Sequence, residues 1–327
     1  MNPKKTNKQR QSVAQAKIQK FLLPLFAIII IVSIWLLFFH SSKKSFDGGQ
    51  AYAYLKRQCE FGPRNPGSEG HRKCKTYLIN TLETFCDRVV QQNFSYIDKK
   101  DTTNIYHGTN IIGSINLRPK RKKRIMLGAH WDTRPIADED PNPENRNKPI
   151  IGANDGASGV AILLELARIL QSADLEIGVD FILFDLEDLG DNNAELFPDS
   201  LNPFSIGAEY FAATNNGYWP SFGILLDMVG DGDLEIKKEA FSIANAKYIV
   251  EKVWDVARVQ GKNAFSEQDG KAIFDDHVPL LKRGIPVINI IDFDYPYWHA
   301  MEDTPDKCSA ESLQTVGDVL FQVILNE

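Results

Sequence analysis

The chain has 327 residues, of which 43% are hydrophobic, 24% charged and 10% aromatic. These fractions are ordinary for a globular protein, and they exclude a disordered chain, a collagen-like repeat and a disulfide-dense miniprotein. The formal net charge is −6, but residues 1–20 contain six Lys and Arg and no acid, so the rest of the chain carries −12. Because phosphate contacts need clustered Lys and Arg, this acidic body argues against a nucleic-acid partner.

The first predicted element is a transmembrane helix over residues 21–39, which contain no charged side chain. A membrane-spanning helix needs about 20 apolar residues, whereas the apolar region of a cleavable signal peptide has about 7–15. No small-residue cleavage site follows the segment, so we expect an uncleaved signal anchor rather than a cleaved signal or a buried core helix. Six positive charges before the segment and two after it predict a single-pass protein with a cytoplasmic N-terminus.

This topology divides the chain into four parts. We expect a basic cytoplasmic tail at 1–20, the anchor at 21–39, a juxtamembrane linker at 40–50 and one folded domain at 51–327. The domain would lie outside the cytoplasm, in a periplasm or in a secretory lumen, and the sequence does not distinguish between these compartments.

An exported domain could form disulfides between its four cysteines. The even number permits up to two bridges in three possible pairings, and free buried thiols are an equally good interpretation. The residues concerned are Cys59, Cys74, Cys86 and Cys308.

Five continuous apolar runs predict the strands of the domain. Because they do not alternate between apolar and polar residues, they are typical of strands buried on both faces of a largely parallel sheet. With helical spacing between them, they predict a three-layer α/β sandwich in which helices flank a mixed, mostly parallel central sheet. The strands are expected at 111–117, 125–129, 180–184, 222–226 and 287–291, and the helices at 71–86, 160–170, 245–260 and 309–325.

Polar side chains that can bind a metal follow four of these strands. In open α/β sheets, ligands bind beyond the carboxyl ends of the strands, so we expect these side chains to form one site. Imidazole and carboxylate groups without thiolates suit a catalytic zinc ion, which keeps three protein ligands and one open position. The residues are His130 and Asp132, Glu187 and Asp188, Asp227, and His299.

Two loops complete the predicted site. Asp155 stands in the small-residue segment 152–159, directly before a predicted helix. Since Asp is a preferred N-cap residue, it either caps this helix or binds a metal, and its sequence context leaves both interpretations open. The Pro-rich, acidic segment 134–150 is expected to be an exposed rim.

Together these motifs resemble the M28-type zinc hydrolases over residues 61–303. That family builds a two-zinc site from an H-x-D, an N-D-x-A-S-G, an acidic pair, a strand-end Asp and a late His. All five ligand positions of such a site are filled in this chain, which by itself implies an aminopeptidase. They are His130, Asp155, Asp188, Asp227 and His299.

Two finer motifs resemble the glutaminyl-peptide cyclotransferases, or glutaminyl cyclases, of the same superfamily. Residues 275–287 closely follow the pattern D-D-H-x-P-F-L-x-R-G-x-P-V, and Trp298 directly precedes His299. The resemblance implies a zinc-exopeptidase-like fold. It also implies an enzyme that cyclises the N-terminal glutamine of peptides or proteins to pyroglutamate and releases ammonia.

The resemblance assigns metal and proton-transfer roles to individual residues. It implies one zinc ion per chain, bound by Asp155, Asp188 and His299. It makes Glu187 the group that moves the proton, in an acid network completed by Asp227 and Asp275.

The resemblance also implies a substrate pocket formed by Trp298, Tyr295 and Asn289. His130 would be a vestigial ligand of a second metal, or a working one if the site is dinuclear. The animal enzymes have Glu at the position of Asp188, Phe at Tyr295 and His at Asn289. They also carry a Trp shortly after the acidic pair, and the residue that replaces it here is not identified.

The chemistry of cyclisation explains these requirements. The α-amine of the substrate attacks its own side-chain amide, so proximity is supplied largely by the substrate. Zinc would polarise the γ-carbonyl, and Glu187 would take a proton from the amine and return it to the departing ammonia. An aminopeptidase uses a similar carboxylate to activate water between two metals. The segments around Asp275 and Trp298 favour the cyclase, while physiological substrates and oligomeric state are not predicted.

Overall fold

The structure is a computed structural model that describes residues 45–99, 101–117, 123–190 and 204–327. The predicted tail and anchor, residues 1–39, lie outside the described residues. Among the helices that the structure describes, none has the length and apolar character needed to cross a membrane. The first described helix begins at Gly48, within the range predicted as a juxtamembrane linker.

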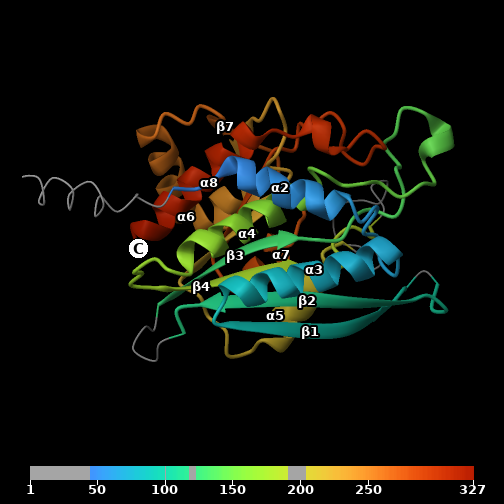
Figure 1. Cartoon of the computed structure of the whole chain (residues 1–327), viewed down its shortest axis with the longest axis horizontal. Helices are drawn as coiled ribbons and strands as arrows, with labels where there is room; N and C mark the ends of the chain where they lie inside the picture. The colour runs from blue at the N-terminus through green and yellow to red at the C-terminus, as the bar shows by residue number, and fades with distance from the viewer. Residues whose placement is uncertain (1–44, 100, 118–122, 191–203) are drawn as a thin grey trace, which may run out of the picture. The chain divides into compact units, whose positions relative to one another are not determined.

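A six-stranded mixed sheet with the strand order β1-β2-β4-β3-β5-β8 forms the centre of the domain (Figure 1). The two pairs that join β1, β2 and β4 are antiparallel, and the pairs that join β4, β3, β5 and β8 are parallel. The α/β class with a mixed sheet is therefore confirmed. The strands are β1 (Arg88–Ile97), β2 (Ile105–Ile115), β3 (Arg124–His130), β4 (Gly178–Phe184), β5 (Phe222–Asp227) and β8 (Val287–Ile291).

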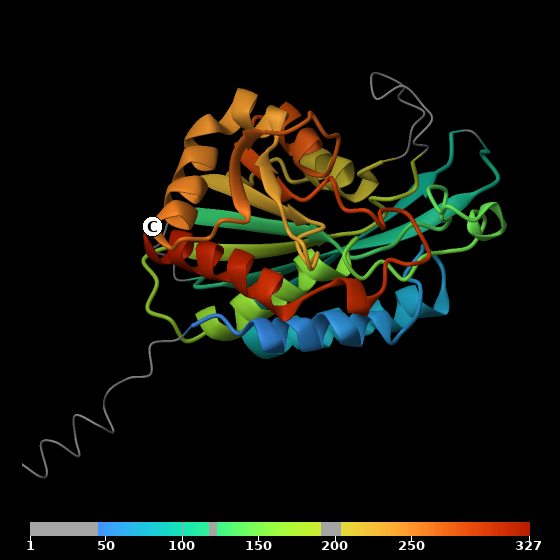
Figure 2. The same ribbon diagram turned by 90° about the horizontal axis from the view of Figure 1, so that it is seen from above.

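Helices cover both faces of this sheet (Figure 2). On one face lie α2 (Gly48–Cys59), α3 (Glu69–Phe85), α4 (Ala157–Leu170) and α8 (Ala310–Leu325). The other face carries α5 (Ile206–Thr214) and α7 (His277–Lys282). Helix α6 (Ala240–Val259) packs against β8 and α8. The three-layer architecture follows from this division of the core.

Smaller elements lie in the connections. Strands β6 (Ile236–Lys238) and β7 (Phe265–Asp269) form a separate parallel pair. Two short 3-10 helices, η1 (Pro143–Asn145) and η2 (Pro305–Lys307), stand in the long loops after β3 and β8.

The continuous apolar runs explain why the central strands form where they do. Every residue of β4 is buried, and so is every residue of β3 except Arg124. In α4 only Arg168 is not buried, because this helix packs between the sheet and helices α2, α3 and α8. Strands β3 and β4, which helices cover on both faces, must be apolar on both faces, as the sequence pattern predicted.

All four cysteines are free thiols, so the structure supports the second of the two interpretations left open by the sequence. Burial raises the pKa of Cys59 and of Cys74 to about 12. Because the thiolate is the reactive form, these buried thiols are chemically inert at neutral pH.

Candidate metal centre

The carboxyl ends of the parallel strands deliver polar side chains to one edge of the sheet. His130 and Asp227 are the last residues of β3 and β5, and Glu187 and Asp188 follow β4 closely. Asp155 stands in the turn before α4, and His299 lies in the loop after β8. The structure brings these segments together at the edge where the sequence placed the site.

The first group of candidate ligands consists of Asp155, Asp188 and His299. His299 Nε2 lies 3.6 Å from Asp155 Oδ2 and 3.4 Å from Asp188 Oδ1. The ligand atoms all lie within 4.8 Å of one another, and the three side chains are buried. Asp188 reaches the group although it is one methylene shorter than the Glu of the animal enzymes.

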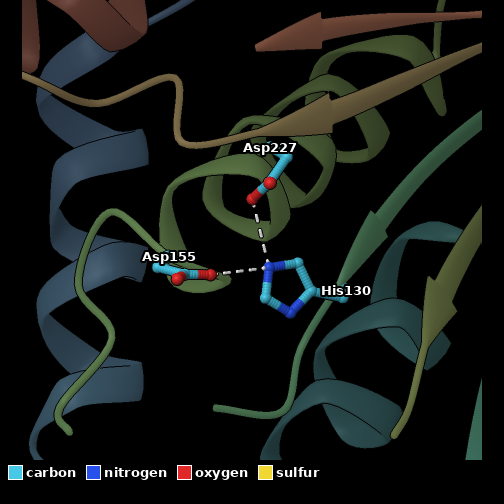
Figure 3. A group of neighbouring side chains, drawn as sticks. All are labelled: His130, Asp155 and Asp227. Atoms are coloured by element: carbon cyan, nitrogen blue, oxygen red, sulfur yellow. Dashed lines mark hydrogen bonds and ion pairs between the residues drawn. The ribbon is translucent and has the colours of Figure 1, made fainter. Parts of the chain in front are cut away.

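The second group consists of His130, Asp155 and Asp227 (Figure 3). His130 Nε2 lies 3.1 Å from an oxygen of Asp155 and 3.1 Å from an oxygen of Asp227. Asp155 belongs to both groups, with Oδ1 toward His130 and Oδ2 toward His299. The arrangement therefore has the outline of two adjacent metal positions that share one carboxylate.

The electrostatics of the two imidazoles reflect the surrounding carboxylates. Burial alone would lower the pKa of His130, but the neighbouring carboxylates of Asp132, Asp155 and Asp227 raise the pKa well above its usual value. Burial likewise opposes the charge of His299, yet the charge of Asp188 and the contact with Asp138 raise its pKa to about 9. The carboxylates around both imidazoles thus stabilise positive charge at these positions.

The residues also fit a zinc ion by their chemistry. Two carboxylates and one imidazole are the oxygen and nitrogen donors that a catalytic zinc takes. Asp188 Oδ2 is a buried atom without a hydrogen-bond partner among the described residues. A buried carboxylate oxygen left in this state is costly unless a cation or donor satisfies it.

Backbone strain is concentrated at the site. Leu186, Met228 and His299 are non-glycine residues with φ of 58°, 45° and 52°. Leu186 directly precedes Glu187, Met228 directly follows Asp227, and His299 is itself a candidate ligand. Side chains of this size rarely adopt left-handed backbone, and such residues persist at sites where the surrounding structure fixes them.

Glu187 lies beside the first group with only 9% of its surface exposed. Burial, followed by the negative charge of Asp188, raises the pKa of Glu187 well above its usual value. The charges of Asp275 and Asp276 act in the same direction, and His130 opposes them. Glu187 is therefore a buried carboxyl group whose surroundings favour its protonated form more than water does.

Asp275 and Asn289 form a buried pair next to this carboxyl. Asn289 Nδ2 donates to Asp275 Oδ2 at 2.6 Å, and the Asn289 main-chain N–H donates to Ser242 Oγ. Asn289 is 1% exposed in β8. The resemblance implied a place in the substrate pocket, and the structure shows Asn289 as a buried residue that bonds Asp275.

Tyr295 has a similar supporting position. Its side chain is 3% exposed, and its hydroxyl donates to Asp303 Oδ1 at 2.8 Å. The Asp303 carboxylate also accepts the main-chain N–H groups of Asn154 and Asp155. Tyr295, predicted as a pocket residue, thus connects the His299 loop to the turn that carries Asp155.

Trp298 is the one of the three predicted pocket residues that is partly exposed. Its ring stacks on the His299 imidazole with 4.0 Å between the ring centroids and contacts the ring of Phe293. The indole therefore packs directly on a candidate metal ligand, while its part in a substrate pocket stays a prediction.

Sequence reasoning missed Arg134 and Asp138, because segment 134–150 was expected to be an exposed rim. Arg134 is fully buried, and its guanidinium bonds Asp138 and Asp188. Asp138 Oδ1 lies 3.4 Å from His299 Nδ1. The only signal in the sequence was the position of Arg134 shortly after His130, in a region crowded with acids.

Comparison with known proteins identifies the family. The family described as "Peptidase family M28" matches residues 110–324. The chain belongs to peptidase family M28. Within M28 it is similar to the glutaminyl-peptide cyclotransferase of Bos taurus, with 24% identity over 80% of this chain and 78% of that protein.

Two solved structures match this chain over 87% of its length. The glutaminyl cyclase of Bacteroides thetaiotaomicron, crystallised with N-acetylhistamine, is 39% identical with a TM-score of 0.81 and is covered to 99%. A leucine aminopeptidase precursor from the same organism is also 39% identical, with a TM-score of 0.82 and coverage of 98%. The predicted resemblance to glutaminyl cyclases within the M28 superfamily is confirmed, and the chain is also similar to proteins that are named as aminopeptidases.

Proposed function

We propose that this chain cyclises the N-terminal glutamine of peptides or proteins to pyroglutamate, with one zinc ion as its cofactor. The observation that carries the choice of reaction is the position of two residues from the cyclase-like motifs. Asp275 lies close enough to raise the pKa of Glu187, and Trp298 stacks on His299. Both motifs therefore meet at the candidate metal centre.

In the proposed reaction the substrate is both nucleophile and electrophile. Its α-amine nitrogen forms a bond to the δ-carbon of the glutamine side chain, and the bond from that carbon to the amide nitrogen breaks. Glu187 would accept the proton that the amine loses and deliver it to the nitrogen that leaves as ammonia. No water is consumed, and the ring closure needs only that both ends of the glutamine are held together.

The zinc ion would be held by Asp155, Asp188 and His299. When bound there it would supply a Lewis acid for the γ-carbonyl oxygen. Asp132 supports this arrangement, because its carboxylate accepts the main-chain N–H groups of Glu187 and Asp188. The proton carrier and one proposed ligand are thus fixed by the same side chain.

The second candidate function is a dinuclear aminopeptidase. It is favoured by the complete second group, in which His130 Nε2 contacts both Asp155 and Asp227 at 3.1 Å. In that reaction Glu187 would act on a water molecule instead of on the substrate amine. The two functions differ in the number of metal ions and in the products.

Incubation with a Gln-Xaa dipeptide separates the two functions. We expect release of ammonia and a product lighter than the substrate by one ammonia, with no free amino acid. A chelator should stop the reaction, and added zinc should restore it. Free glutamine together with two tightly bound zinc ions per chain would instead establish the aminopeptidase.

We also propose that residues 21–39 anchor the chain in a membrane, with the catalytic domain outside the cytoplasm. The proposal is supported by the uncharged apolar segment and by the excess of positive charge before it. A reporter enzyme that works only outside the cytoplasm should be active when it is fused to the C-terminus. A reporter active in the cytoplasm would overturn this topology.

A further inference from the structure

Arg134 makes an unusual set of contacts for a residue in a surface loop. Its Nε and Nη2 atoms bond the two oxygens of Asp138 at 2.6 and 2.7 Å. Nη1 donates to Asp188 Oδ1 at 2.8 Å and contacts the Asp188 carbonyl at 3.4 Å. Nη2 also donates to the Gly190 carbonyl at 2.8 Å. These bonds engage every N–H of the guanidinium, which is buried.

Asp138 extends this arrangement to His299. Its Oδ1 atom lies 3.4 Å from His299 Nδ1, on the opposite side of the imidazole from the Nε2 atom that faces Asp155 and Asp188. A carboxylate beside one ring nitrogen favours the proton on that nitrogen and leaves the other available to a metal. A carboxylate at the position of Asp138 favours the His299 tautomer with its proton on Nδ1, which leaves Nε2 facing Asp155 and Asp188.

Arg134 also leaves Asp188 suited to bind an ion. It donates to Oδ1, whereas Oδ2 has no hydrogen-bond partner among the described residues. A buried carboxylate needs a compensating positive charge, and the guanidinium supplies one without occupying the second oxygen. The planar fork of Arg can do this for Asp138 and Asp188 together, which the single ammonium of Lys cannot.

We propose that Arg134 is a positioning residue of the metal centre, which fixes Asp188 directly and His299 through Asp138. The proposal rests on the zinc site of the proposed function. It adds that two of the three zinc ligands, contributed by segments far apart in the chain, are held in register by one guanidinium. Arg134 would act only through these two ligands, so we assign it no catalytic role.

The chain offers a matched control at the first residue of β3, the strand that ends shortly before Arg134. Arg124, the first residue of β3, bonds both oxygens of Asp180 through Nε at 2.8 Å and Nη2 at 2.6 Å. This fork resembles that of Arg134 but lies at the amino ends of the parallel strands. If substitutions at both positions weakened zinc binding equally, the loss would be a general effect of breaking an Arg–Asp pair and not specific to the metal centre.

The experiment compares Arg134→Lys and Arg124→Lys in the full chain. Zinc affinity is measured by competition with a chelator, and ligand geometry by the visible absorption spectrum of the cobalt-substituted protein. Supporting residues of metal ligands typically contribute 10–100-fold to affinity, so we expect Arg134→Lys to weaken zinc binding by about that factor and to change the cobalt spectrum. Arg124→Lys should leave both readouts at the parental values.

Asp138→Asn is the second variant, in case Arg134→Lys does not fold. It keeps the shape of the side chain and the bond between Arg134 and Asp188, but it removes the charge behind His299. We expect a smaller loss of zinc affinity with a changed cobalt spectrum. Parental affinity and spectrum in either folded variant, or an equal loss in Arg124→Lys, would overturn the proposal.

These readouts do not depend on the reaction catalysed. If the parental chain binds zinc but releases free glutamine from the dipeptide, the cyclase assignment fails and the role of Arg134 stands. If the chain cyclises glutamine but Arg134→Lys binds zinc as the parent does, only the role of Arg134 fails. A parental chain that binds no zinc would overturn both.

Discussion

The two ends of the central sheet use the same ion pair for different purposes. At the amino end, Arg124 bonds Asp180, whose oxygens also accept the hydroxyls of Ser114 and Tyr218. Every charged or polar side-chain atom of this network has a partner. At the carboxyl end, Arg134 bonds Asp138 and Asp188, but Asp188 Oδ2 has no hydrogen-bond partner within the described ranges.

The same contrast extends to neighbouring side chains. Asp276 and Asn289 at the carboxyl end also have buried oxygens without hydrogen-bond partners in the described structure. The strained residues Leu186, Met228 and His299 lie at this end as well. Buried polar groups are normally satisfied, and exceptions mark sites of function. The network at the amino end is satisfied by its own side chains, whereas buried oxygens at the carboxyl end have no hydrogen-bond partner among the described residues, as is typical of a site that binds an ion.

The largest effect is expected from Glu187→Gln. The substitution removes the proton carrier but none of the three proposed ligands, so kcat should fall by about 10²–10⁴-fold while zinc binding is retained. Ammonia release and zinc content measure the two quantities. The exposed Glu311→Gln should behave as the parent. Near-parental turnover in Glu187→Gln would remove this residue from the mechanism.

Breaking the amino-end network should affect stability instead of catalysis. Arg124→Met leaves the buried Asp180 carboxylate without its charged partner, and breaking a buried pair typically costs about 3–5 kcal/mol. Urea unfolding of the variant should show this loss. Its kcat, measured below the unfolding transition, should be unchanged. A large decrease in kcat would show that the two ends are coupled.

Two tyrosines allow a finer comparison of the ends. Tyr218→Phe removes the bond to Asp180, and Tyr295→Phe removes the bond to Asp303. Each should lower the free energy of unfolding by about 1 kcal/mol, the usual net value of one hydrogen bond. Only Tyr295→Phe should also weaken zinc binding, because Asp303 holds the turn of Asp155. Equal zinc affinities in both variants would contradict the supporting role of Tyr295.

The smallest effect is expected in the zinc content of His130→Asn. If the site binds one ion, the variant should still contain one zinc per chain. Its rate of ammonia release should be higher than that of Glu187→Gln. Metal analysis of the purified protein decides this point. A decrease from two ions to one would favour the dinuclear aminopeptidase.

The fold could be predicted where burial leaves a clear pattern in the sequence. Strands β3, β4, β5 and β8 are apolar on both faces and appear as continuous runs. Strand β1 was missed because it is an edge strand in which only Phe94 is fully buried. Helix α5 was also missed, since its nine residues are too short for a helical period to stand out.

The candidate site was predictable to the extent that each residue follows its own strand. His130, Asp188 and Asp227 need only the rule that strand ends meet at one edge of the sheet. Arg134 and Asp138 have no such local signal, because their role depends on a loop that folds back against segments far away in the sequence. The supporting positions of Tyr295 and Asn289 were unpredictable for the same reason, since a side chain's partner is set in three dimensions.

The shared position of Asp155 has a consequence for how this scaffold can change its chemistry. One carboxylate serves the His130 side through one oxygen and the His299 side through the other. Loss of the ion on the His130 side would therefore leave every donor on the His299 side in place. A hydrolase and a ring-closing enzyme can then differ by the number of ions retained, with no rebuilding of the backbone between them.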